Sequence, residues 1–161
     1  MLGALDHALL RLLQTHGHAP PIERAVILYT RAGEHGAIWL ATGAVGSLFG
    51  GRRKRVYRST VRAVGLTLLA NSAVKLTIRR LRPQLEDLPP VVATMSRLSY
   101  PSAHASTSFA GARVLSRALP GPLVYGVATT MALSRVYLGV HWPSDVLAGA
   151  LLGTAVAELS T

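Results

Sequence analysis

The chain has 161 residues, which is the size of one domain. Half of its residues are hydrophobic and only 15% are charged, whereas soluble globular domains carry about 25% charged residues. This composition excludes a disordered chain and argues against a soluble domain. The absence of cysteine excludes a disulfide framework, a thiolate zinc site and a cysteine nucleophile. The net charge of +10 leaves nucleic acid, an anionic membrane surface or a phosphorylated substrate as the partner.

A short amphipathic helix is predicted at the N-terminus, over residues 2–15. Its leucines fall on one side and the segment is too short to cross a bilayer, so we expect it to lie in the membrane interface. Pro20-Pro21 separates it from a second short helix at 22–31.

Five apolar segments follow, and each is typical of a membrane helix. They cover residues 35–49, 59–78, 102–118, 123–138 and 144–159. We therefore predict one all-α domain over residues 1–161, an integral membrane bundle of five to six transmembrane helices. The start of the bundle stays open, because 22–31 either continues into the first apolar segment as a kinked span or forms a helix of its own.

Two pairs of glycines have the four-residue spacing that favours close helix packing. Gly149 and Gly153 lie in the last apolar segment, and Gly46 and Gly50 lie at the end of the first. For the second pair, coincidence is the favoured interpretation, because the chain holds 15 glycines.

The basic residues are concentrated in one loop, at Arg52, Arg53, Lys54, Arg55 and Arg58. Nucleic-acid binding is one interpretation. Apolar segments flank the loop on both sides, however, and only one aromatic residue is interleaved, so a cytoplasmic loop that follows the positive-inside rule is favoured. Alternating the helices from this loop places residues 79–101 outside the cell and the C-terminus in the cytoplasm. We expect a multi-pass protein of the inner, cytoplasmic membrane.

Lys75 and Arg82 form the first polar motif, seven residues apart and followed by Pro83. Seven residues make about two helical turns, so both side chains can project from one face of a helix end. An ammonium and a guanidinium suit a phosphate there, the first as a point charge and the second as a bidentate fork. Alone, this signal is weak, because basic residues at the ends of membrane helices are ordinary.

The second motif is Pro101-Ser102-Ala103-His104, at the start of the next apolar segment. Serine after proline predicts a helix N-cap, and a helix N-terminus is a ready anion site. His104 then falls in the first turn, where it could donate a proton. A plain cap beside an interfacial histidine is the alternative.

The third motif runs from Ser134-Arg135 to His141 and Asp145. The last two lie four residues apart across a helix start, so the carboxylate could accept a hydrogen bond from one imidazole nitrogen. The other nitrogen would then be free to act as a nucleophile or base. The alternative is that Asp145 is a simple helix-start acid.

Taken together, these motifs resemble the pattern of the type 2 phosphatidic acid phosphatase superfamily, K-x6-RP, then PSGH, then SR-x5-H-x3-D. The matching positions run from Lys75 to Asp145. The chain departs at one position, where Ala103 stands in place of the usual glycine. The added methyl group is expected to alter the pocket or the helix start slightly rather than to abolish the site. The resemblance implies a membrane enzyme that hydrolyses a lipid phosphate or diphosphate with no metal and no cofactor.

The resemblance also implies a role for each matched residue. His141 resembles the family nucleophile, which attacks phosphorus to form a phosphohistidine, and Asp145 resembles its orienting acid. His104 resembles the general acid that protonates the leaving group and later activates water as a base. The phosphate-binding set corresponds to Lys75, Arg82, Ser102, Ala103 and Arg135. Three fixed cations suit phosphoryl transfer, which depends mainly on positioning and charge stabilisation.

The expected partners are a lipid-phosphate substrate and the lipid bilayer, without nucleic acid, and the sequence does not indicate an oligomeric state. A short chain with no large loop for headgroup recognition favours a polyprenyl-linked substrate, either undecaprenyl diphosphate or a decaprenyl-phosphoribose phosphate. The outward arginines Arg79, Arg80 and Arg97 are expected to attract an anionic headgroup.

Two further alternatives stay open at this point. Vanadate-dependent haloperoxidases resemble the same motifs, but they are larger and soluble, so the five apolar segments argue against them. A non-enzymatic membrane scaffold or anion-binding subunit could also retain the motif residues.

Overall fold

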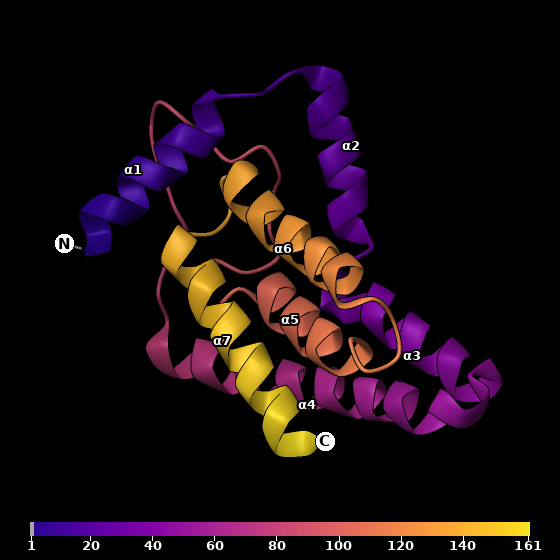
Figure 1. Ribbon diagram of the computed structural model, residues 1–161. Helices are drawn as coiled ribbons and strands as arrows, with labels where there is room; N and C mark the ends of the chain where they lie inside the picture. The colour runs from indigo at the N-terminus through magenta and orange to yellow at the C-terminus, as the bar shows by residue number, and fades with distance from the viewer. Residues whose placement is uncertain (1) are drawn as a thin grey trace.

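A computed structural model of the chain describes residues 2–161, and over this range the regular structure is helical. Figure 1 shows the arrangement. The α-helices are α1 (Leu2–Thr15), α2 (Pro20–Arg31), α3 (Ala37–Phe49), α4 (Lys54–Ile78), α5 (Ala103–Leu115), α6 (Gly121–Tyr137) and α7 (Pro143–Ser160). Each segment predicted to be helical overlaps one of them, and α4 begins five residues earlier than predicted. The prediction of an all-α fold is therefore confirmed.

The connection between α2 and α3 answers the question that the sequence left open. His35 and Gly36 adopt left-handed backbone conformations, with φ of 51° and 72°. Helix α2 ends at Arg31, and the two left-handed residues lie directly before α3, so residues 22–31 form a helix of their own rather than part of a kinked span. Glycine suits the second position because it has no Cβ to clash there.

Helix α5 is the centre of the bundle and packs against α4, α6 and α7 (Figure 1). None of its 13 residues is exposed, and most of them are alanine, serine, threonine or glycine. Such small side chains let neighbouring helix backbones approach closely. Polar atoms on α5 find partners across the contacts, as where Trp39 of α3 donates its indole N–H to the Ser108 hydroxyl at 2.9 Å.

The contact between α5 and α7 depends on Gly149 and Gly153. A Cβ on Gly149 would lie 2.6 Å from the carbonyl oxygen of Ser102, and one on Gly153 would overlap the carbonyl of Ser106. The close approach also joins the two helix starts, where the Ser102 N–H donates to the carbonyl of Asp145 at 3.0 Å. The second and third sequence motifs are thereby held side by side.

The pair Gly46 and Gly50 also has a packing role, so coincidence was the wrong interpretation. A Cβ on either glycine would overlap the ring of Tyr57, which packs between the end of α3 and the start of α4. The ring fills the space that the missing side chains leave. The four-residue spacing of small residues thus marks a helix contact at both places in this chain.

Large apolar side chains cover much of the outer surface of the bundle. Phe49 on α3 is 81% exposed and Leu159 on α7 is 90% exposed, and leucines on α4 and α6 also face outward. Within residues 2–161, only the helical segment Gly51–Ile78 meets the length and composition of a membrane span by itself, with 28 residues and a mean hydropathy of 1.3. The predicted number of five to six spans is not established by this finding.

Helix α1 faces the protein with two polar side chains and one leucine. Asp6, Leu10 and Gln14 are buried at four-residue intervals, whereas Leu5, Leu9 and Leu12 are exposed. A helix on a soluble domain would turn most of its leucines toward the core. The orientation agrees with a helix whose outer side lies in the membrane interface.

The tight contact at Gly153 generates a test of the packing. Gly153→Ala should lower the stability of the folded protein by about 1–3 kcal/mol, because the new methyl group must push α7 away from the backbone of α5. Thermal unfolding in detergent measures this. Gly65→Ala on α4 is the matched control, because its Cβ would meet nothing within 4 Å, and it should keep or raise the stability. Equal melting temperatures for the two variants would contradict the packing argument.

Candidate active site

Four helix ends meet around one pocket of about 330 Å³. Lys75 comes from the last turn of α4 and Arg135 from the last turn of α6, while the start of α5 and the α6–α7 connection supply histidines. Six of the predicted site residues line the pocket, namely Lys75, Arg82, Ala103, His104, Arg135 and His141. Residues separated by up to 66 positions in the sequence are thereby brought together.

The cations of the first motif are held by neutral groups. The Lys75 ammonium lies 3.4 and 3.5 Å from the carbonyl oxygens of Leu98 and Ser99. Arg82 donates to the carbonyl of Ser96 at 2.7 Å and to that of Val140 at 2.6 Å. Carbonyl groups orient these side chains but leave their positive charge uncompensated.

Arg135 adds a third positive charge and is only 8% exposed. Its Nε atom is buried and has no hydrogen-bond partner among the described residues. Within residues 2–161, none of the three cations lies within 4.0 Å of a carboxylate oxygen. The exposed carboxylate of Glu34 also lines the pocket and acts on Arg135 only from a greater distance. Three cations without an ion-pair partner still outnumber this one acid, so the pocket is suited to an anion with several oxygens.

His141 lies between this cationic group and a buried carboxylate. Its Nε2 atom is 3.0 Å from a guanidinium nitrogen of Arg82. Because guanidinium can only donate, Nε2 must carry the lone pair and Nδ1 the proton. The structure therefore selects the tautomer whose nucleophilic nitrogen faces the pocket. Burial, followed by the charge of Arg82, holds the pKa of His141 below its usual value against the opposing effect of Asp145, so the ring is neutral at pH 7.

Asp145 is fully buried behind His141 rather than in the pocket itself. One oxygen, Oδ2, accepts the Trp142 N–H at 2.9 Å and lies 3.6 Å from Nδ1 of His141. The other, Oδ1, accepts from Arg80 at 2.8 Å. Asp145 is thus a helix-start acid that lies beside the imidazole. The predicted hydrogen bond is not formed at 3.6 Å, and Nδ1 has no partner among the described residues, so the orienting role of Asp145 stays a prediction.

The position of Arg80 differs from the expectation that it attracts a headgroup from outside. Its guanidinium points inward to Asp145 and to a second buried carboxylate, that of Asp6. The sequence analysis did not identify Arg80 or Asp6 as part of the site. The available signal was the scarcity of acids, because the chain holds only 7 acidic residues and a buried one requires a cation.

His104 is fixed by a residue that the motifs did not indicate. Its Nε2 lies 3.2 Å from the carbonyl oxygen of Thr30, near the end of α2. A carbonyl can only accept, so Nε2 carries the proton and Nδ1 the lone pair. Gly33 allows this approach, since a Cβ there would lie 3.0 Å from the His104 ring. The α2–α3 connection is therefore a wall of the site.

The two remaining predicted residues lie at the N-terminus of α5. Ala103 lines the pocket. Ser102 is completely buried, and its hydroxyl accepts the Ala105 N–H at 3.5 Å as the helix N-cap. Its predicted part in binding phosphate stays a prediction, because it does not line the pocket in this structure.

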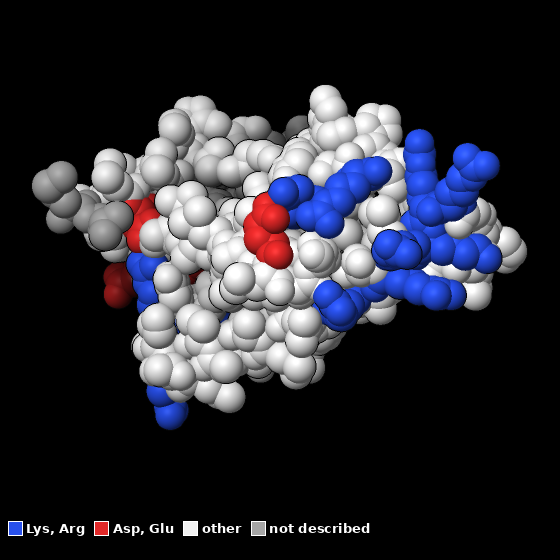
Figure 2. Space-filling view, turned by 60° about the horizontal axis from the view of Figure 1, so that its bottom comes forward, with Lys and Arg blue, Asp and Glu red and all other residues white. Residues whose placement is uncertain are grey.

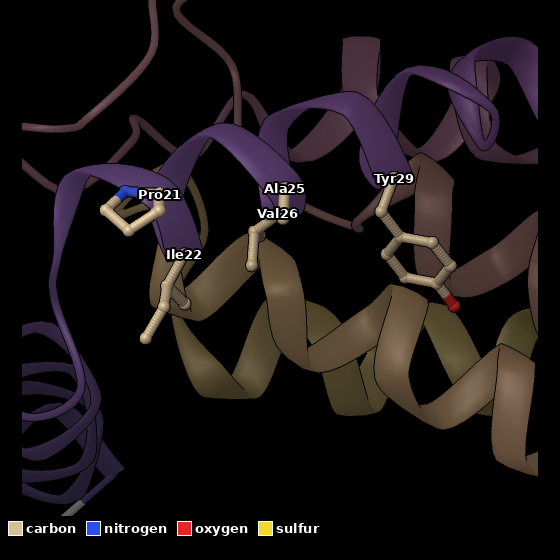
Figure 3. A pocket seen from close by; sticks show the side chains of 5 residues that line it. All are labelled: Pro21, Ile22, Ala25, Val26 and Tyr29. Atoms are coloured by element: carbon tan, nitrogen blue, oxygen red, sulfur yellow. The ribbon is translucent and has the colours of Figure 1, made fainter.

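A separate hollow of about 430 Å³ lies along α2. Figure 3 shows the side chains that line it, which project from one side of α2 toward the neighbouring helix: Pro21, Ile22, Ala25, Val26 and Tyr29. The Tyr29 hydroxyl donates to the carbonyl of Val127 on α6 at 2.9 Å. Among the described residues, none of the side chains that line this hollow is charged, and its one hydroxyl is bonded to α6, so the charged chemistry belongs to the other pocket.

The three motifs and their shared pocket agree with a comparison against known families. The family described as the PAP2 superfamily matches residues 57–161, a range that contains every predicted site residue. The chain belongs to the PAP2 superfamily. The resemblance drawn from the motifs is thereby confirmed.

Individual relatives in the PAP2 superfamily include a decaprenylphosphoryl-5-phosphoribose phosphatase of Mycolicibacterium smegmatis, which is 39% identical over 117 residues. The match covers 73% of this chain and 65% of that protein, so the chain spans just under two thirds of this relative.

Two solved structures of PAP2-type proteins share the fold. LpxE of Aquifex aeolicus has a TM-score of 0.83 and 25% identity, with 97% of this chain and 94% of that chain covered. A transmembrane PAP2-type phosphatidylglycerolphosphate phosphatase from Bacillus subtilis has a TM-score of 0.77 and 26% identity, with 98% and 83% covered. These neighbours support the predicted membrane-protein fold, and relatives named as phosphatases of lipid-linked phosphates support the predicted class of enzyme.

The uncompensated cations generate a binding test. Orthovanadate, a phosphate analogue, should raise the melting temperature of the protein in detergent, because a ligand that binds only the folded state stabilises it. Arg135→Gln should weaken this binding by about tenfold or more, equal to roughly 1.4 kcal/mol. Arg113→Gln removes an arginine that pairs with Glu158 outside the pocket, and it should bind vanadate normally. Equal affinities in both variants would refute the assignment of the pocket.

Proposed function

We propose that this protein is a membrane phosphatase that hydrolyses a lipid phosphate or diphosphate through a phosphohistidine intermediate on His141. The observation that carries the proposal is the lone pair of His141 Nε2, which is directed into a pocket with three uncompensated cations. A nucleophile beside an anion cradle is the minimum that phosphoryl transfer requires.

The first half of the reaction forms the phosphoenzyme. The phosphate takes the place of the Arg82–His141 contact and is held by Lys75, Arg82 and Arg135. Nε2 of His141 then attacks phosphorus, and the bond between phosphorus and the leaving oxygen breaks. His104, which enters the step as the imidazolium, gives its Nδ1 proton to that oxygen and keeps its Nε2–H on the carbonyl of Thr30. The oxygen leaves as the lipid alcohol or lipid phosphate. The carboxylate of Asp145 offsets the positive charge that develops on the imidazole.

The second half releases inorganic phosphate. His104, now deprotonated, takes a proton from water, and the resulting oxygen nucleophile attacks the phosphohistidine. The bond between phosphorus and Nε2 breaks, and the electron pair returns to His141. In both steps, Lys75, Arg82 and Arg135 stabilise the negative charge that is spread over the phosphate oxygens.

A polyprenyl-linked phosphate is the proposed class of substrate. The name of the Mycolicibacterium relative supports a decaprenyl-phosphoribose phosphate over undecaprenyl diphosphate. The exposed leucines and phenylalanine of the bundle favour a substrate whose tail stays in the bilayer while its phosphate reaches the pocket.

We infer that α3 to α7 cross the membrane with the active site outside the cell. Helix α4 begins at the basic cluster formed by residues 52–58 and ends at Lys75 beside the pocket, so these two features lie at opposite ends of one helix. Figure 2 shows the strong gathering of basic side chains at one end of the molecule. The positive-inside rule places that end in the cytoplasm. Helix α3 has only 13 residues, or about 20 Å, and therefore needs adjoining residues to reach across.

Loss of the nucleophile tests the reaction. The purified protein, assayed with a polyprenyl phosphoribose phosphate in the presence of EDTA, should release inorganic phosphate, and His141→Ala should reduce turnover by on the order of 10³-fold or more. His16→Ala is the control, because His16 is exposed and bonds only within its own region. Denaturing gels should reveal a labelled phosphoenzyme in the native protein but not in His141→Ala. A wild type that releases no phosphate from any lipid substrate would favour a non-enzymatic subunit.

The proposed orientation has its own test, which the absence of cysteine makes simple. Met95→Cys places a thiol in the 79–101 connection, where Met95 is 101% exposed, and Thr161→Cys places one at the C-terminus. A thiol reagent that cannot cross the membrane should label the first variant in spheroplasts and the second only after permeabilisation. The opposite pattern would invert the topology.

A further inference from the structure

A single arginine joins two buried carboxylates behind the nucleophile. One guanidinium nitrogen of Arg80 donates to Asp6 at 2.7 Å, and the other donates to Asp145 at 2.8 Å and to the Ser144 hydroxyl at 2.7 Å. The two acids are 5% and 0% exposed at their side chains, whereas the arginine is 32% exposed. The arginine therefore has one edge at the surface and its donors inside.

Asp6 also holds the start of the helix that carries Asp145. Its Oδ1 accepts the backbone N–H of Ser144 at 2.8 Å, and its Oδ2 accepts the hydroxyl of the same residue at 2.5 Å. Ser144 lies in the first turn of α7, where backbone N–H groups have no partner within the helix. Helix α1 thus provides a cap for α7 across 138 residues of sequence.

We propose that Asp6 and Arg80 are positioning residues for His141, and that α1 is for this reason part of the active site. They fix the rotation of the Asp145 carboxylate so that Oδ2 faces Nδ1 of the imidazole. The inference rests on the proposed function for its effect on turnover, and its geometric part stands on the contacts alone.

Arg80 can fix the orientation of Asp145 because leaving an oxygen of a buried carboxylate without a hydrogen-bond donor is costly. Asp145 has two oxygens, and Arg80 and the Trp142 N–H occupy one each, which leaves a single orientation that satisfies both. Without Arg80, Oδ1 loses its charged donor and the carboxylate is free to turn away from the imidazole. Without the charge of Asp6, Arg80 loses the partner that holds its guanidinium group in the plane needed to reach Asp145.

A second ion pair attaches α1 to the same part of the molecule and provides a control. Arg11 pairs with Asp87 at 2.5 Å, and both side chains are about half exposed, at 48% and 58%. This pair contributes to the docking of α1 but does not contact the buried carboxylates. A variant of Asp87 thus separates the attachment of α1 from the positioning of Asp145.

The experiment compares Asp6→Asn, Arg80→Lys, the double variant and Asp87→Asn, all as full chains in detergent. Asp6→Asn and Arg80→Lys should each lower kcat by about tenfold or more with KM changed less than twofold. The first removes the charge that holds Arg80, and the second replaces two donor nitrogens at a fixed separation with one. The double variant should lose little more than either single variant, because both residues act through one contact. Asp87→Asn should keep the native kcat. Melting temperatures show whether each variant is folded under the assay conditions.

A spectroscopic measurement makes the geometric part independent of activity. With histidine labelled by nitrogen-15, His141 should be observed as the Nδ1–H tautomer in the native protein and in Asp87→Asn, with the resonance assigned by its absence from His141→Ala. In Asp6→Asn the Arg82 donor still fixes the tautomer, but Nδ1–H should lose the neighbouring Oδ2 of Asp145, so its resonance should move by more than in Asp87→Asn. A His141 Nδ1 resonance and a kcat that are both unchanged in Asp6→Asn overturn the proposal. An inactive native protein whose Nδ1 resonance still responds to Asp6→Asn overturns the proposed function and leaves the positioning role standing.

Discussion

The close contact between the starts of α5 and α7 is the constraint on which the site depends. Both helices begin at the pocket, and their backbones meet because Gly149 and Gly153 present no side chain to α5. The same contact joins Ser102 to the carbonyl of Asp145. The second and third sequence motifs, on separate helices, are therefore positioned by a contact between two backbones, which is stiffer than a contact between long side chains. The small residues of α5 serve this arrangement, and its polar side chains are satisfied within the bundle.

Burying charge in this bundle is costly, and the buried charged groups either pair inside the protein or face the pocket. Lys75, Arg82 and Arg135 are oriented by carbonyls or left without a partner, an arrangement that favours a bound anion. Asp6 and Asp145 are buried and share Arg80. The net charge of +10 therefore has different sources. They are the exposed cluster at 52–58, the three pocket cations, and a cation that pairs with buried acids. Nucleic acid is not needed to explain any of them.

The sequence predicted the helices, the family and six pocket-lining residues, because apolar length and motif spacing are local properties. It did not predict the parts that Thr30, Asp6 and Arg80 have in the site. Their contacts join segments that lie 65 to 74 residues apart, and no motif marks them. The spacing of Gly46 and Gly50 was misinterpreted for a related reason. Its significance depends on the ring of Tyr57, which follows in the next helix and carries no spacing signal of its own. Local patterns thus revealed the reacting groups, while the groups that orient them required the fold.

Helix α1 has two functions that use opposite sides of the same short element. Leu5, Leu9 and Leu12 face outward, where a bilayer would accept them, and Asp6 faces inward to Arg80 and the start of α7. A 14-residue helix is marginal by itself, so its structure depends on both surfaces being occupied. The predicted position of α1 in the membrane interface would therefore make the lipid surface one of the supports of the Asp145 carboxylate.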